Sequence, residues 1–330
     1  MLLTLPLILF IVMTELSVGA FTVLFLLDWR NLVKRSFLVT YSIIYVILTG
    51  LTVLFQQNFS SLELLNTFTM LDKAWTGYLS LTLPVFLVLM ILYTVFLVPD
   101  KKAGVDGKVK KEAVEVGGSR RSTLRLLRLI SGSLTVLAGM VTLFVLGMIF
   151  RPLASSSLAG AFVVGGFFAS ALALGGVMTA MWLGHWYLVT PALSEKPLQF
   201  AATLVLIGVL AQVVFAFTAG ISTEAHSQAS NVVKPAVTAT ATSSVSAATP
   251  APTSQVKPSN APVVAPLSTD VIGWLRILVA FILPLVLLGF ILKLIHDRSF
   301  QSATGMLYLV VVLTLAGEAM ARGLFLTGLQ

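Results

Sequence analysis

Eight apolar runs, each about 20 residues or longer, constrain this chain more than any other feature of its sequence. They cover residues 4–27, 37–56, 75–98, 129–150, 157–189, 199–221, 271–293 and 303–326. A helix needs about 20 apolar residues to cross the hydrocarbon core of a bilayer. The runs therefore predict an all-α, polytopic integral membrane bundle of eight transmembrane helices.

The overall composition agrees with a lipid environment. Hydrophobic residues make up 57% of the 330 residues, charged residues make up 10%, and the mean hydropathy is +0.98. Ordinary globular chains contain roughly 25% charged residues, so this chain has too few polar side chains to cover a water-soluble surface. The apolar runs are continuous rather than alternating, which favours helices over the strands of an outer-membrane barrel.

The basic residues predict the orientation of the bundle. Of the 21 lysines and arginines, 15 lie in the loops at 28–36, 99–128, 190–198 and 293–302. By the positive-inside rule these loops face the cytoplasm, so both termini are expected outside. The net charge of +8 is then explained by loops held against anionic membrane lipid, and it predicts no nucleic-acid partner.

Two long loops divide the chain. Residues 99–128 end in arginines at near-helical spacing, which predicts an amphipathic segment against lipid headgroups or, alternatively, a docking surface for a cytoplasmic partner. These arginines are Arg120, Arg121, Arg125 and Arg128. Residues 222–270 are mostly Ala, Pro, Ser, Thr and Val, which predicts a disordered outer linker. We therefore expect a six-helix bundle at 1–221 and a two-helix hairpin at 271–330.

The absence of cysteine excludes several kinds of redox site. With no cysteine in the sequence, the chain cannot form disulfides, ligate an iron–sulfur cluster through thiolates or attach a c-type haem. One of its three histidines, His185, lies at the cytoplasmic end of the fifth run, where it is a candidate haem ligand or proton acceptor. No metal site and no soluble-enzyme motif is predicted.

Three charged residues lie within the first and last apolar runs. Because a charge in hydrocarbon costs at least a few kcal/mol, such residues face the bundle interior and are candidate functional groups. Glu15 lies about 16 Å into the first run, and Glu318 lies about 12 Å from the outer surface in the last. Arg322 shares a helix face with Glu318. Glu318 and Arg322 form either an intrahelical pair that only aids insertion, or, with Glu15, a polar site.

The second run carries a polar stripe on one helix face. The stripe consists of Tyr41, Tyr45, Thr49, Thr52 and Gln56. Either these side chains form hydrogen bonds between helices, or they line a cavity. Two arginines at the outer ends of other runs, Arg151 and Arg276, are interpreted as interfacial anchors.

The two ends of the chain resemble a known family. Residues 315–325, LAGEAMARGLF, resemble the Gly-Glu-x-x-x-Arg-x-x-Phe pattern in the last helix of the membrane-anchor subunits of dimethyl sulfoxide reductase-like enzymes. These anchors belong to the polysulfide reductase membrane-subunit superfamily. The first run, with PLILF at 6–10 and ELSVGAF at 15–21, is similar to the opening helix of the same anchors.

The resemblance implies a quinone-interacting anchor subunit in a bacterial plasma (inner) membrane. Such an anchor takes electrons from menaquinol, its substrate, and passes them to an iron–sulfur or other redox subunit, and it holds no covalently bound cofactor. Glu15 and Glu318 would accept protons, and Arg322 would hold their charge. The donors to the quinone oxygens would be Tyr41, Tyr45 and Thr49.

Two other classes of function fit the same sequence. A stand-alone transporter or permease could use the buried charges to couple ions to a solute. A non-catalytic scaffold or assembly factor could use them only to fix helix packing. A quinone subunit would be inactive without its redox partner, whereas a transporter would move its solute in liposomes.

Overall fold

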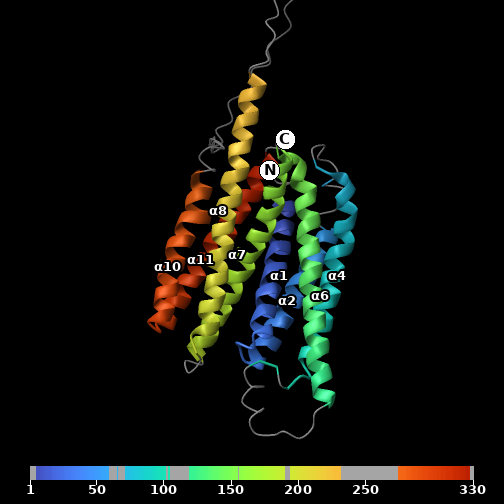
Figure 1. Ribbon diagram of the computed structural model, residues 1–330, viewed down its shortest axis with the longest axis vertical. Helices are drawn as coiled ribbons and strands as arrows, with labels where there is room; N and C mark the ends of the chain where they lie inside the picture. Colours follow the sequence, from blue (N-terminus) through green and yellow to red (C-terminus); the bar gives the residue numbers. More distant parts are fainter. Residues whose placement is uncertain are drawn as a thin grey trace, which may run out of the picture.

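The computed structural model describes residues 5–58, 65, 71–101, 103–104, 119–154, 156–189, 194–231 and 274–327. The longer helices are α1 (Leu5–Trp29), α2 (Arg35–Asn58), α4 (Lys73–Leu97), α6 (Ser119–Phe150), α7 (Ser157–Val189), α8 (Lys196–Asn231), α10 (Leu283–His296) and α11 (Phe300–Thr327). Two short helices are η1 (Arg151–Leu153) and η2 (Ile277–Ile282). Within these residues, eight helical segments are long and apolar enough to span a membrane. The protein is therefore an all-α, multi-pass membrane bundle, as the apolar runs predicted (Figure 1).

Two helices extend beyond the apolar runs that predicted them. Helix α6 begins at Ser119 rather than at 129, and α8 continues to Asn231 rather than ending at 221. The first extension brings the arginines of the basic loop into a helix, and the second includes the first residues of the predicted linker. Residues 105–118 of that loop and 232–270 of the linker lie outside the described residues.

Helix α1 is the central helix of the bundle. Its membrane span is 83% buried, whereas the other seven spans are 28–61% buried. It packs against α2, α6, α7 and α11. Helices α10 and α11 lie beside α7 and α8, so the hairpin belongs to the same bundle as the first six helices (Figure 1). Helix α1 begins and α11 ends at one end of the bundle, which we call the outer end after the predicted orientation.

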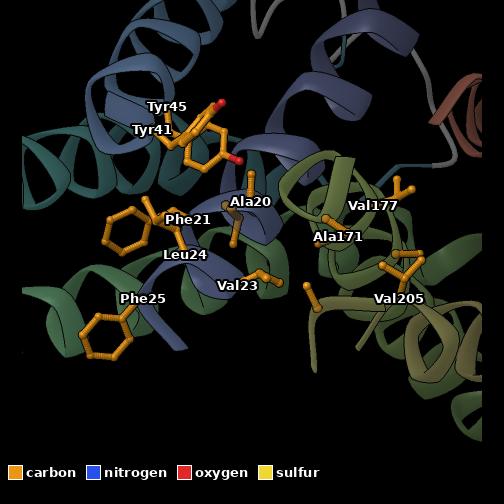
Figure 2. Close-up of a cluster of buried hydrophobic side chains, with 14 of the residues drawn as sticks. Ala20, Phe21, Val23, Leu24, Phe25, Tyr41, Tyr45, Ala171, Val177 and Val205 are labelled. Carbon is orange, nitrogen blue, oxygen red and sulfur yellow. The ribbon is translucent and has the colours of Figure 1, made fainter. Parts of the chain in front are cut away.

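Small residues allow α1 and α7 to cross at close range. A Cβ atom at Gly19 would overlap the backbone of Ala171, and one at Gly175 would overlap the backbone of Gly19 and Ala20. Figure 2 shows Ala20 and Ala171 in one cluster of buried side chains, with Phe21 pointing away from α7. Because the two backbones touch, polar groups on α1 and α7 lie close together.

The seventh span contains an irregular turn. Residues 277–282 form a π-helix, in which the Leu283 amide donates to the Leu278 carbonyl five residues earlier. Pro284 follows directly, and a proline has no amide hydrogen and collides with the carbonyl four residues before it, here Ala280. Widening to a π-turn relieves that collision. Ala280 in turn packs so closely on α11 that a Cβ at Gly317 would overlap it.

Candidate functional site

Five polar side chains from four helices meet in the outer half of the bundle. We call this group the outer cluster, and it consists of Glu15 on α1, Ser170 on α7, Gln212 on α8, and Glu318 and Arg322 on α11. The Arg322 guanidinium donates to Glu15 and lies 2.7 Å from Glu318 Oε1. The structure thus brings together the two carboxylates and the arginine that the sequence placed at similar depth.

The uncharged members of the outer cluster connect its charged members. Ser170 Oγ donates to Glu318 Oε1 at 2.9 Å and accepts from Arg322 Nη2 at 3.2 Å. Gln212 Nε2 donates to Ser170 Oγ and to Glu318 Oε2, both at 2.9 Å. Glu318 therefore accepts hydrogen bonds from α7 and α8 in addition to the arginine on its own helix. The network fixes the position of this carboxylate between three helices.

Glu15 is held less completely than Glu318. Its side chain is fully buried, and one carboxylate oxygen pairs with Arg322. The other oxygen, Oε2, has no hydrogen-bond partner among the described residues. Arg322 also lies over the ring of Phe167, with its Cζ atom 3.9 Å from the ring centroid. Two carboxylates therefore share one guanidinium, and the three groups carry a net charge of −1 when both acids are ionised.

A cavity of about 210 Å³ adjoins the outer cluster. Its polar lining residues are Ser170, Gln212, Arg276, Glu318 and Arg322. Its apolar lining includes Leu153, Phe162, Val163, Phe215 and Ala216, and the rings of Phe162 and Phe215 lie 6.1 Å apart. The cavity is thus an apolar pocket with ionisable and hydrogen-bonding groups on one part of its wall, which is the general composition of a small-molecule site.

Arg276, which the sequence predicted as an interfacial anchor, also belongs to the cavity wall. Its side chain is half-buried, and its guanidinium lies over the ring of Phe281. Arg151, the other predicted anchor, is exposed and packs over Gly160.

The predicted quinone donors on α2 lie elsewhere. Tyr45 and Thr179 share a hydrogen bond of 2.8 Å between their hydroxyl groups, and Thr49 donates to the Tyr45 carbonyl at 2.8 Å. Tyr41 packs against Phe37 and Trp182. All three predicted donors are buried between helices, and none lines the cavity described above. This placement matches the interpretation in which the stripe connects helices.

The candidate haem ligand is not in the interior. His185 is exposed near the C-terminal end of α7. No group of three or more potential metal-ligating side chains occurs among the described residues.

A second buried charge cluster, which sequence analysis missed, lies at the end of α1 opposite the outer end of the bundle. This inner cluster consists of Asp28, Tyr93, Asp100 and Arg128. Arg128 lies 3.3 Å from Asp28 and 3.0 Å from Asp100, and Tyr93 donates to Asp28 at 2.9 Å. Arg128 is only 1% exposed. Its predicted contact with lipid headgroups is therefore wrong, because α6 is rotated so that this arginine faces α1 and the end of α4.

Comparison with known proteins gives no further assignment. No protein-family model matches the chain, and no curated protein matches it.

Proposed function

We propose that this protein is a quinone-interacting membrane subunit of a respiratory oxidoreductase. One observation carries the proposal, namely the cavity in which a buried carboxylate, Glu318, adjoins hydrogen-bond donors and an apolar wall. A quinol needs an apolar site for its ring and a proton acceptor within hydrogen-bond reach of its hydroxyl group. The resemblance of the first and last helices to quinone-binding anchors supports the same function.

The proposed reaction is the two-electron oxidation of menaquinol to menaquinone. Both O–H bonds of the quinol break, two protons leave, and two electrons pass to an iron–sulfur subunit bound to this chain. Glu318 touches the substrate and accepts the first proton. Glu15 does not touch the substrate and acts through Arg322. It is ion-paired with that guanidinium, and its other carboxylate oxygen has no hydrogen-bond partner among the described residues. It is a positioning and proton-holding residue.

The proposed setting is a bacterial plasma membrane with the cavity in its outer half. The basic loops then face the cytoplasm, and the protons from the quinol are released toward the outside. Since the chain contains no cysteine to ligate an iron–sulfur cluster, the electron acceptor must be in a partner subunit.

Binding of a fluorescent quinol analogue tests the proposal directly. The probe is 2-heptyl-4-hydroxyquinoline N-oxide, titrated into the full chain in lipid nanodiscs and followed by the quenching of its own fluorescence. We expect saturable binding at about one analogue per chain. Gln212→Leu should weaken this binding at least tenfold, because it removes the two hydrogen bonds that hold Ser170 and Glu318 in position at the cavity wall.

Thr314→Val is the matched control for the cavity variants. Thr314 is buried on the same face of α11, one turn from Glu318, but its hydroxyl donates only to carbonyls of its own helix and it does not line the cavity. Its variant should bind the analogue like the wild type. Absence of saturable binding to the wild-type chain would overturn the proposal.

Recovery of the native complex tests the predicted partner. The tagged chain is purified from its native membranes in a mild detergent, and the proteins that accompany it are identified by mass spectrometry. We expect an iron–sulfur subunit at a ratio near one to one. A chain that is recovered alone, and that oxidises no quinol, would contradict the electron-transfer part of the proposal.

A transporter is the second candidate function, and one observation favours it. The π-helical turn and Pro284 interrupt the span that contributes Arg276 to the cavity, and broken helices commonly form the binding sites of transporters. This candidate predicts solute flux through liposomes that contain only this chain, whereas the quinone proposal predicts none.

A further inference from the structure

The outer cluster leaves one cation of the cavity without an ion pair. Arg322 is paired with both carboxylates. Arg276 lies beyond the 4.0 Å ion-pair distance from every carboxylate in the described part of the chain, and its Nε has no hydrogen-bond partner there. The ring centroid of Phe281 lies 5.6 Å from its Cζ atom. A half-buried guanidinium that lines a cavity, and that has no ion pair to a carboxylate of the described residues, can donate to a ligand.

The charges around the cavity suit a neutral ligand when both acids are ionised. Glu318, Arg276 and Arg322 line the cavity, and Glu15 is joined to it through its ion pair with Arg322. Two carboxylates then face two guanidinium groups, so a ligand with its own charge would add an uncompensated charge in a low-dielectric region. A neutral molecule that enters from the lipid does not incur this cost.

The hydrogen-bonding capacity of the wall indicates two ligand oxygens of different character. An ionised carboxylate has about four lone-pair sites, and Glu318 uses three of them, for Ser170, Gln212 and Arg322. The fourth can accept a hydrogen bond from a ligand hydroxyl. Arg276 can only donate, so it requires an acceptor oxygen.

We propose that Arg276 is the second binding group of the cavity, and that the site recognises a neutral aromatic ring with one oxygen that donates to Glu318 and another that accepts from Arg276. A half-oxidised or fully reduced quinone ring has this chemistry. The inference rests on the proposed function and adds to it the residue that recognises the oxygen farther from Glu318.

The test uses two ligands that differ in one oxygen atom. The first is 2-heptyl-4-hydroxyquinoline N-oxide, whose hydroxyl can donate to Glu318 and whose N-oxide oxygen can accept from Arg276. The second, 2-heptyl-4-hydroxyquinoline, lacks the N-oxide oxygen and is measured by competition against the first. Both are titrated into the wild-type chain, Arg276→Met and Arg276→Lys in lipid nanodiscs.

The expected result is a loss of binding that depends on the second oxygen. Arg276→Met should weaken binding of the N-oxide by roughly tenfold or more, which is the effect of one hydrogen bond to a charged group. It should leave binding of the one-oxygen ligand unchanged. Arg276→Lys should retain part of the preference, because it keeps a cationic donor without the planar fork.

Arg151→Met provides the matched control. This arginine also lies at the outer end of the bundle, but it is exposed and does not line the cavity, so its removal should change neither affinity. If the wild type binds the N-oxide and Arg276→Met binds both ligands as the wild type does, this inference is wrong and the quinone proposal stands. If the wild type binds neither ligand, both are wrong.

Discussion

The outer and inner clusters share four kinds of group but have different surroundings. Each contains a carboxylate of α1, an arginine from a helix far along the chain, a second carboxylate and a hydroxyl group. The outer cluster forms part of the wall of a cavity, whereas the four residues of the inner cluster line no part of that cavity. Similar groups therefore occur in two settings, and a neighbouring cavity distinguishes the outer cluster from the inner one.

The difference shows that burial of a charge in a membrane span does not by itself identify a functional site. A buried ion pair contributes little net stability compared with apolar packing, but removing one partner leaves a costly unpaired charge. The inner cluster, which joins α1, α6 and the end of α4, therefore holds helices in register. The outer cluster also connects helices, and in addition it borders a cavity that is open to a ligand.

The largest effect should follow from breaking the inner cluster. Arg128→Met leaves Asp28 and Asp100 without their cation and should destabilise the fold by about 3–5 kcal/mol. Denaturation of the purified chain in detergent measures this loss. The triple variant Arg128→Met, Asp28→Asn, Asp100→Asn should recover much of the stability because no charge remains unpaired. The folded fraction of the single variant and of the triple variant should bind the quinol analogue with wild-type affinity. Weakened binding would show that the inner cluster is also part of the site.

The next largest effect concerns chemistry rather than folding. Glu318→Gln keeps the size of the side chain but removes the proton acceptor, so quinol oxidation by the native complex should fall at least a hundredfold. Stability should change little, because the variant removes one of two carboxylates that share a single arginine. Turnover is measured with a soluble quinol and compared with that of Thr314→Val. Turnover within a factor of two of the wild type would exclude Glu318 as the acceptor.

A smaller effect is expected from widening the contact between α1 and α7, which should disturb the outer cluster and leave the inner cluster intact. Gly175→Ala places a methyl group against the backbone of Gly19 and Ala20 and should cost about 1–3 kcal/mol. The shift moves α1 away from α7, which contributes Ser170 to the outer cluster but nothing to the inner cluster. The analogue should therefore bind more weakly to this variant. Gly50→Ala on α2 is the control, since a Cβ there meets nothing within 4 Å and Gly50 does not line the cavity.

The smallest effect should come from the polar stripe of α2. Tyr45→Phe removes one hydrogen bond to Thr179 and should cost about 1 kcal/mol of stability. It should leave binding of the analogue unchanged, because Tyr45 does not line the cavity. A tenfold loss of binding would instead restore the original prediction that this stripe contacts the quinone.

The sequence predicted the spans and the main charged residues well, because hydropathy and depth are both local properties. Glu15, Glu318 and Arg322 stand out since few charges occur in apolar runs. Ser170 and Gln212 do not, because single uncharged polar residues are common in membrane helices. A carboxylate near a helix end, such as Asp28, is indistinguishable from a loop residue until the partner helix is placed.

An arginine near a helix end was the main source of error. A long basic side chain at that depth normally extends to the membrane surface. That expectation fails for Arg128, which is buried and paired with Asp28 and Asp100. The rotation of α6 that brings it inward depends on packing between distant segments, and so does the position of Arg276 in the cavity wall. Neither can be read from one segment alone.

The central position of α1 also constrains how the protein is made. Glu15 is translated 307 residues before Arg322, the cation with which it pairs. Asp28 likewise precedes Arg128 by the length of two intervening spans. During synthesis the first helix is therefore in the membrane before its cations are made. Until then we expect Glu15 and Asp28 to be protonated or shielded by the insertion machinery. Assembly of the outer site is completed only when α11 arrives, so chains interrupted before that point are expected to be targets for membrane quality control.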